Sequence, residues 1–297
     1  MSGHAARILA QAKINLALRV FGLRPDGYHS IETVFLRLEL GDDVEVRITQ
    51  GEKSVRCFEM RDKRPEENLA YRAAELYAKE TGWPKGFEIE IVKNIPLGGG
   101  LGGGSADAAG VLRILNTLAT TPVAPDKLLE MAAVLGSDVP FLAGDQVMAM
   151  SWGRGERLLP VKPLPPRELE LFFPPFGVNS AEAYAMLDAD RGEYAGPGPE
   201  LTTEMFRDWE SAARSSINDF EAVMRPRHPE IDALLARGEK YGQFYRMTGS
   251  GSTVFKVAGV STRSTLSEAE PQLALPEGTE RIFTRTAWSV VPVELLD

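Results

Sequence analysis

The order of hydrophobic and polar residues along the chain predicts a mixture of short strands and helices. Patterns typical of strands cover residues 7–20, 31–40, 44–49, 54–60, 87–92, 146–152, 156–161, 168–173, 243–247, 253–257 and 280–286. Patterns typical of helices cover residues 69–81, 106–118, 126–135, 181–188, 204–213, 220–224, 230–237 and 262–270. Because both kinds occur in both halves of the chain, the predicted fold class is α+β.

Turn and capping residues predict where these elements break. Gly41-Asp42-Asp43 is expected to form a turn between two strands, and Asn68 fits the N-cap of the helix that follows it. The proline-rich stretch at residues 160–166 favours extended, linker-like chain. Since 297 residues suffice for two domains, the expected division is 1–161 and 162–297.

Composition removes several classes of function. The chain has 33 basic and 42 acidic residues, a net charge of −9, which argues against nucleic-acid and anionic-membrane partners. Its single cysteine, Cys57, excludes an internal disulfide and a cysteine-based metal cluster, and is expected to be a packed thiol. No apolar run approaches membrane-spanning length and residues 1–7 are too short for a signal peptide, so the expected location is the cytoplasm.

The strongest chemical signal is the glycine run at residues 96–109, Pro-Leu-Gly-Gly-Gly-Leu-Gly-Gly-Gly-Ser-Ala-Asp-Ala-Ala. A strand pattern precedes it and a helix pattern follows it. Glycine lacks a Cβ atom, so its backbone N–H groups can approach a ligand closely. The helix start adds unpaired N–H groups and the positive end of the helix dipole. Together these features predict a phosphate-binding loop.

A flexible linker and two familiar glycine-rich motifs fit the run less well. A linker does not usually lead straight into an Ala- and Leu-rich helix. The dinucleotide-binding fingerprint is formally present at Gly98-x-Gly100-x-x-Gly103, but a loop at 120–126 stands where a strand with an acidic end is expected. The P-loop of nucleoside triphosphatases needs Gly-Lys-Ser/Thr, and no lysine follows these glycines.

Three further stretches carry candidate chemistry, each with a simpler alternative. Lys13 and Asn15 share one face of a strand, where the lysine either points at phosphates or is merely solvated. Tyr28 and His29 follow a Pro-Asp-Gly turn and either contact a base or belong to a surface turn. Asp138 lies at a helix–loop junction as either an N-cap or a functional carboxylate, and its position alone favours the cap.

A second glycine turn, Thr-Gly-Ser-Gly-Ser at 248–252, completes an ordered set of four blocks, either as a hairpin turn or as a second anion site. The others are Ala-Lys-Ile-Asn-Leu at 12–16, the glycine loop, and Gly-Ser-Asp-Val-Pro-Phe at 136–141. This set resembles the galactokinase, homoserine kinase, mevalonate kinase and phosphomevalonate kinase (GHMP) superfamily. Two more blocks, Arg-Pro-Asp-Gly-Tyr-His at 24–29 and Ile-Asn-Asp-Phe-Glu at 217–221, resemble members whose substrate carries cytidine diphosphate.

The resemblance implies a GHMP kinase fold with a ribosomal-S5-like N-terminal domain and a ferredoxin-like C-terminal domain. It implies ATP-dependent phosphorylation of the 2-hydroxyl of a cytidine-diphosphate-linked methylerythritol, in non-mevalonate isoprenoid and terpenoid biosynthesis. The expected partner is therefore a small molecule, and Mg²⁺ would bridge the ATP phosphates on few protein ligands. The expected assembly is a monomer or a weak homodimer.

The resemblance also implies roles for individual residues. Asp138 would be the general base, and Lys13 would keep it ionised and stabilise the transferring phosphoryl group. Asn15 would place the substrate. The ATP site would comprise Pro96, Leu97, Gly98, Gly99, Gly100, Leu101, Gly102, Gly103, Gly104, Ser105 and Ala106, with Asn68 and Lys93 near the adenine. The substrate site would add Tyr28 stacked on cytosine, His29 hydrogen-bonded to it, Tyr184 as a second aromatic, and Gly249, Ser250 and Gly251 on the phosphate side.

One position departs from the family pattern, and rival hypotheses stay open. Many relatives have a second serine where this chain has Ala106, so a hydroxyl contact to phosphate or Mg²⁺ would fall to Ser105 or water. The rivals are a kinase for mevalonate, homoserine or a sugar, a non-catalytic nucleotide sensor, and more distantly an NAD-binding oxidoreductase. Tyr28 and His29 argue against the first, whose substrates have no base, and Lys13 with Asp138 argues against the sensor.

Overall fold

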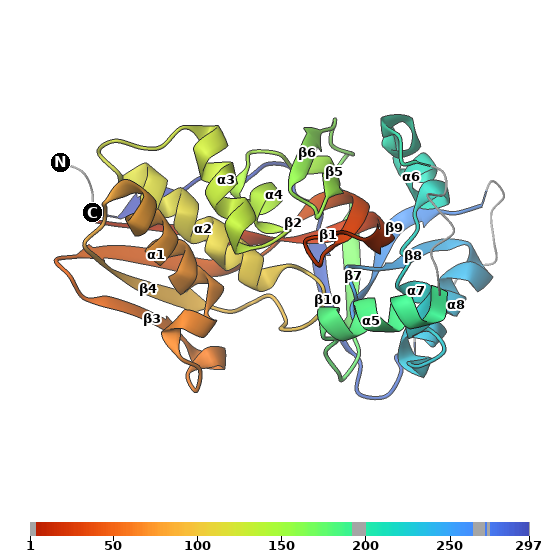
Figure 1. Ribbon diagram of the computed structural model, residues 1–297. Coiled ribbons are helices and arrows are strands. Elements are labelled where there is room, and N and C mark those ends of the chain that lie inside the picture. Colours follow the sequence, from red (N-terminus) through yellow and green to blue (C-terminus); the bar gives the residue numbers. More distant parts are fainter. Residues whose placement is uncertain (1–3, 192–199, 264–270, 272–273, 297) are drawn as a thin grey trace.

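The computed structural model describes residues 4–191, 200–263, 271 and 274–296, and it contains two β-sheets (Figure 1). The first sheet has the order β11-β1-β2-β4-β3, with β5 paired to β2 and β6 to β5. Its strands are β1 (Ala5–Leu23), β2 (His29–Thr49), β3 (Lys53–Cys57), β4 (Gly86–Val92), β5 (Met148–Gly153), β6 (Arg157–Pro160) and β11 (Glu294–Leu296). The second sheet is antiparallel with the order β10-β7-β9-β8, from β7 (Glu168–Phe173), β8 (Gln243–Met247), β9 (Val254–Ser261) and β10 (Glu280–Arg285).

Helices pack on both sheets. The first sheet carries α1 (Leu69–Thr81), α2 (Gly103–Leu118), α3 (Pro125–Leu135) and α4 (Val139–Ala143). The second carries α5 (Ser180–Arg191), α7 (Glu221–Met224) and α8 (Pro229–Tyr241) on one face and α6 (Trp209–Ser215) on the other. Three 3₁₀ turns complete the described elements (Phe58–Met60, Pro65–Glu67 and Thr203–Phe206). The alternation within β7 explains this layering, because Leu169 and Leu171 face one core and Phe172 the other.

The long ribbon of β1 and β2 joins the two halves of the molecule (Figure 1). Buried residues of β1 up to Ala17 and of β2 from Val34 onward belong to the core under α2. Leu18, Val20 and Ile31 lie instead in the second core, with residues of α5, α7 and α8. The ribbon therefore contributes to both cores, and side chains midway along it lie where the two halves meet.

The structure corrects the predicted turn at residues 41–43. The chain runs through as the single strand β2, in which Gly41 pairs with Gln11 and Asp42 with Ala10. A Cβ atom on Gly41 would lie 2.9 Å from the Ala10 carbonyl oxygen, so glycine here permits a close approach of two strands. Asp42 is fully buried, and its carboxylate accepts the N–H group of Ile95 at 2.8 Å, which offsets part of the cost of its burial.

Several other boundaries differ from the expectation. Helix α2 begins at Gly103, three residues earlier than predicted, and the predicted helix at 204–213 is a 3₁₀ turn followed by α6. The predicted helix at 262–270 falls largely outside the described residues. Strand β11 was not predicted, and it pairs with β1 in the first sheet. The division of the chain at residues 161 and 162 stays a prediction. Among the described helices, none has the length and apolar character needed to cross a membrane.

Candidate active site

A cavity of about 820 Å³ opens between the glycine loop, the middle of β1, the start of α4 and helix α5. It gathers residues from all four sequence blocks. The predicted site residues that line it are Lys13, Asn15, Tyr28, His29, Gly98, Gly100, Gly102, Gly103, Gly104, Ser105, Asp138, Tyr184, Gly249 and Ser250. Residues distant in the sequence thus meet at one cavity.

A buried lysine and a partly exposed aspartate face each other in this cavity. Lys13 Nζ lies 3.2 Å from Asp138 Oδ2, and the two side chains are 4% and 28% exposed. The ammonium group also donates to Asn15 Oδ1 at 2.8 Å and to the Gly100 carbonyl at 3.1 Å, so its three donors are all used. Asp138 occupies the N-cap position of α4, yet its side chain makes no capping bond there. Its carboxylate is therefore available to the cavity.

Asn15 connects this pair to the second glycine turn. Its Oδ1 atom accepts from Lys13 and, at 3.1 Å, from the N–H group of Gly249, while its Nδ2 atom donates to Thr33 Oγ1 at 2.8 Å. The Gly249 N–H group thus bonds to the protein. The turn joins β8 to β9, as a hairpin turn does, and also lines the cavity. The substrate-placing role of Asn15 stays a prediction.

The glycine loop needs its glycines for backbone geometry. Gly98, Gly100 and Gly102 have φ angles of 72°, 76° and 73°, in the left-handed region that favours glycine. A Cβ atom on Gly100 would overlap the carbonyl oxygen of Thr248, so the two glycine turns touch through backbone. The loop residues that do not line the cavity are Pro96, Leu97, Gly99, Leu101 and Ala106, and Gly251 of the second turn does not line it either.

Asn68 and Lys93 lie at a second cavity of about 500 Å³. The Asn68 side chain accepts the N–H group of Ala70 at 2.9 Å, which confirms the predicted N-cap of α1. The Lys93 ammonium group is buried between the carboxylates of Asp42 and Asp107, the latter at 2.8 Å. A contact of either residue with adenine stays a prediction.

The buried cluster of Asp42, Lys93 and Asp107 is unbalanced in charge, because two carboxylates share one lysine. Burial, opposed by Lys93 and reinforced by Asp42, raises the pKa of Asp107 from 3.8 to about 7. Its Oδ1 atom is buried without a hydrogen-bond partner among the described residues. A buried carboxylate that lacks a full set of partners costs stability when it ionises.

Asp107→Asn is expected to stabilise the protein, and more so at high pH. Between pH 3.8 and about 7 the folded chain holds a proton at Asp107 that the unfolded chain has lost, so wild-type stability falls as pH rises through this window. Asparagine has no such dependence. Its advantage should grow by on the order of 2 kcal/mol from pH 5 to pH 7 and then stay level. Urea unfolding at pH 5, 7 and 8 measures this, with Asp62→Asn on the surface as control; a pH-independent difference would contradict it.

The opposite end of the cavity is aromatic. Tyr28 is exposed, and the Arg154 guanidinium group lies 4.9 Å from its ring centroid. The His29 ring stacks on Tyr184 with centroids 4.8 Å apart and an interplanar angle of 11°. Burial, with a contribution from the Asp138 carboxylate, raises the pKa of Tyr184 to about 12, so its hydroxyl stays neutral. Flat, apolar surfaces with polar edges suit a base.

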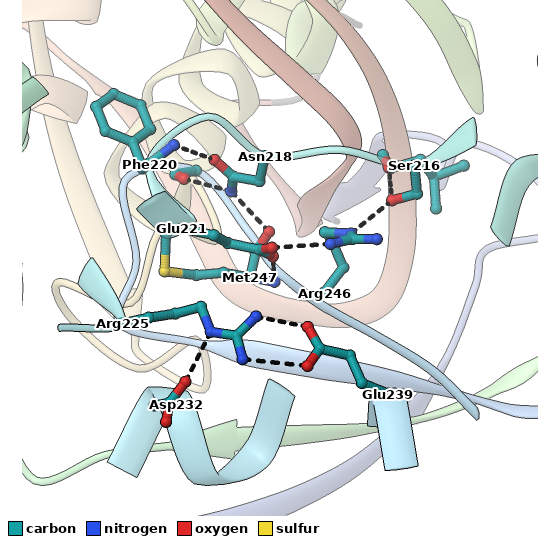
Figure 2. A network of polar contacts seen from close by, with 11 residues as sticks. Ser216, Asn218, Phe220, Glu221, Arg225, Asp232, Glu239, Arg246 and Met247 are labelled. Carbon is teal, nitrogen blue, oxygen red and sulfur yellow. Dashed lines mark hydrogen bonds and ion pairs between the residues drawn. The ribbon is translucent and has the colours of Figure 1, made fainter. Parts of the chain in front are cut away.

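Figure 2 shows Asn218 and Glu221, from the block at 217–221, bonded to Met247, the residue directly before the second glycine turn. Asn218 Nδ2 donates to the carbonyl oxygens of Met247 at 2.8 Å and Gly249 at 2.9 Å. Glu221 accepts from the Met247 N–H group and from Arg246 Nη1, both at 2.8 Å. Arg246 also donates to Ser216 Oγ at 3.0 Å. These bonds fix the turn whose N–H group reaches Asn15, which gives this block a structural task that its sequence did not reveal.

Besides Ser137, which stands next to Asp138 in its sequence block, sequence reasoning missed three polar residues of the cavity wall, Arg154, Ser180 and Asp188. Arg154 lies at the tip of the β5–β6 hairpin, and the other two lie on α5. None of these three stands in a recognisable motif, so only the folded arrangement identifies them. Within the described residues, no group of three His, Cys, Asp or Glu side chains could hold a metal ion.

Comparisons with known proteins agree with this arrangement. The family model of the GHMP kinases N terminal domain matches residues 68–152. A 4-diphosphocytidyl-2-C-methyl-D-erythritol kinase of Pelotomaculum thermopropionicum is 41% identical over 251 residues, which are 83% of this chain and 87% of that one. The chain belongs to this kinase family. The family member of Bacillus pumilus is 38% identical over 83% of this chain and 86% of its own.

Solved structures show the same kinase family on this fold. A crystal structure of 4-(cytidine 5'-diphospho)-2C-methyl-D-erythritol kinase superposes with a TM-score of 0.70 and 36% identity, covering 86% of this chain and 90% of that one. Homoserine kinase from Cytophaga hutchinsonii superposes with a TM-score of 0.66 at 16% identity, over 99% and 98% of the two chains, and shares the fold. The predicted GHMP kinase fold and the prediction of a small-molecule kinase are therefore confirmed.

Proposed function

We propose that the chain transfers the γ-phosphoryl group of ATP to the 2-hydroxyl of 4-diphosphocytidyl-2-C-methyl-D-erythritol, giving the 2-phosphate and ADP. The observation that carries the proposal is the Lys13–Asp138 pair, set in one cavity between a glycine loop and an aromatic end. The names of relatives that are 35–41% identical support the substrate. The Tyr28 and His29 side chains supply surfaces that suit its cytosine base.

Each of these cavity residues has its own role in phosphoryl transfer. Asp138 accepts the proton of the 2-hydroxyl as that oxygen forms its bond to phosphorus and the bond to the ADP oxygen breaks. Lys13 stabilises the negative charge on the transferring group, from a position held by Asn15 and Gly100. The loop and the first turn of α2 hold the ATP phosphates through backbone N–H groups. The adenine lies toward the second cavity, which Asn68 and Lys93 line.

The described residues fit a Mg²⁺ ion that is held mainly by ATP. Asp138 and Asp188 are the carboxylates of the cavity wall, and Asp138 already pairs with Lys13. Ala106 offers no oxygen, so the Ser105 hydroxyl or water would supply any contact from the loop. When bound, the ion neutralises phosphate charge. The enzyme is further proposed to act in the cytoplasm, as a monomer or weak homodimer, without nucleic-acid or membrane partners.

A turnover assay with four alcohols tests the proposal. ADP release from Mg-ATP is expected with 4-diphosphocytidyl-2-C-methyl-D-erythritol and not with mevalonate, homoserine or galactose, because the last three have no base for the aromatic end of the cavity. Turnover with one of those alcohols instead would refute the assigned substrate and keep the superfamily. Binding of ATP with no turnover on any of the four would favour a nucleotide sensor.

A further inference from the structure

Two cations stand directly opposite each other on the ribbon of β1 and β2. Lys13 pairs with Arg37 in the ladder, so their side chains point to the same face, and the two residues are 3% and 1% exposed. Like charges at opposed positions destabilise a sheet, and burial of a charge adds to that cost. Each cation therefore needs groups that offset its charge. Lys13 lines the cavity, whereas Arg37 does not and cannot reach a substrate there.

The Arg37 side chain binds the C-terminal end of α4. Its Nη2 atom donates to the carbonyl oxygens of Phe141 at 2.6 Å and Leu142 at 3.0 Å. The same atom donates to the Gly144 carbonyl at 2.9 Å, and Nε donates to the Gln146 carbonyl at 2.8 Å. The last carbonyl groups of a helix have no partners within the helix, so the guanidinium group supplies the donors that this end lacks. These bonds fix the end of α4 relative to β2.

The N-terminal end of the same helix carries Asp138, whose carboxylate lies 3.2 Å from Lys13. The two opposed cations thus bind the two ends of one helix. That helix has five residues and is about 7–8 Å long, at 1.5 Å per residue. The link between its ends is direct, because the Asp138 carbonyl accepts the N–H group of Leu142, and Arg37 binds the Leu142 carbonyl.

This arrangement makes the place of the Asp138 carboxylate depend on Arg37. The Asp138 side chain makes no capping bond, so the backbone of α4 determines where its carboxylate starts. Without the guanidinium group, the carbonyls of Phe141 and Leu142 would be buried without these donors, and α4 would have to move to find others. A displacement of about 1 Å in a reacting group can cost about 100-fold in rate.

We propose that Arg37 is a positioning residue for phosphoryl transfer, which holds the C-terminal end of α4 and thereby sets the Asp138 carboxylate beside Lys13. This inference rests on the proposed function for the role of Asp138 as the base. It adds a residue that touches neither substrate and acts through the backbone of one short helix.

Arg37→Met tests the proposal, because it removes the four donated bonds and leaves an apolar side chain of similar length. With Mg-ATP and 4-diphosphocytidyl-2-C-methyl-D-erythritol, kcat should fall about 10- to 100-fold, because the base is displaced. KM for each substrate should stay within about threefold, since Arg37 does not line the cavity. Arg37→Lys keeps the charge with one donor nitrogen in place of three and should lose less. It also carries the test if Arg37→Met does not fold.

A double-mutant cycle with Asp138→Asn separates positioning from a general loss of folded protein. A loss of folded protein would lower the rate equally in both backgrounds. Once the carboxylate is gone its placement no longer matters, so Arg37→Met should lower the rate that remains in Asp138→Asn by less than about threefold. Equal losses in the two backgrounds, or a rise in KM at unchanged kcat, would overturn the inference.

Arg113→Met is the matched control. Arg113 is a partly buried arginine of α2 that also donates to a backbone carbonyl, that of Val291 at 2.7 Å, and it does not line the cavity. Because this bond does not reach α4, the substitution should leave kcat within about threefold of wild type.

Hydrogen exchange, followed by NMR, tests the hold on α4 without any turnover. The N–H groups of Leu142 and Gly144, which bond to the Asp138 and Pro140 carbonyls, should exchange about tenfold faster or more in Arg37→Met and at the wild-type rate in Arg113→Met. Wild-type turnover with unchanged exchange in Arg37→Met leaves the proposed function standing and removes the role of Arg37. Faster exchange in a protein whose wild type turns over none of the alcohols keeps the hold on α4 and removes the proposed reaction.

Discussion

Asp138→Asn is expected to lower kcat by a factor of about 10² to 10⁴, the range that general acid–base catalysis contributes. The amide has the size of the carboxylate but cannot accept the proton of the substrate hydroxyl. Lys13 loses its anionic partner and keeps its bonds to Asn15 and Gly100, so the cavity should retain its shape. KM for ATP and for the alcohol should therefore stay within about threefold. Steady-state ADP release over a range of both substrates measures these constants.

Asp126→Asn is a suitable control for this experiment, because Asp126 is exposed at the start of α3 and away from the cavity wall. It should leave both constants unchanged. If Asp138→Asn retained more than a tenth of the wild-type kcat, the hydroxyl proton would pass directly to the phosphoryl oxygens, and Asp138 would only help to position Lys13.

Gly100→Ala should destabilise the fold by about 2–4 kcal/mol. An alanine at φ +76° costs on the order of 1–2 kcal/mol, and its Cβ atom would overlap the Thr248 carbonyl, which adds an overpacking cost of similar size. The Gly251 carbonyl oxygen, 3.1 Å away, blocks a small shift in that direction. The free energy of unfolding in urea, with the thermal midpoint as a second measurement, gives the effect.

Gly104→Ala provides the opposite result in the same loop. Gly104 lies in the first turn of α2, and apart from its chain neighbours and the adjacent backbone of its own helix, no heavy atom of the described residues stands within 4 Å of its added Cβ. This substitution should stabilise the helix by about 0.5–1 kcal/mol. Equal effects of the two alanines on stability would show that the contact between the two glycine turns is not what requires Gly100.

Local patterns carried most of what could be predicted from the sequence. The glycine loop, the N-cap at Asn68 and the strand that holds Lys13 each depend on neighbouring residues, so a short window contains the signal. Asp138 was ambiguous for the same reason, because its window shows a helix start. Only the fold shows that its carboxylate turns to Lys13 and not to the backbone.

The missed features depend on contacts between distant parts of the chain. Asp188 contacts His29, which lies far earlier in the sequence. No spacing rule links an acidic residue in α5 to a ring in β2. The false turn at Gly41 arose because glycine and aspartate favour turns locally, whereas here glycine admits a neighbouring strand. Strand β11 is three residues long and exposed for most of its length, too short for an alternating pattern to emerge.

The pairing of β11 with β1 also sets an order of events during synthesis. Ala5 pairs with Leu296, so β1 is synthesised long before the strand with which it pairs here. Until residues 294–296 leave the ribosome, this part of β1 lacks its outer neighbour and presents unpaired backbone groups of the kind that recruit other strands. The half of the protein that is synthesised first is therefore the half whose sheet is completed last.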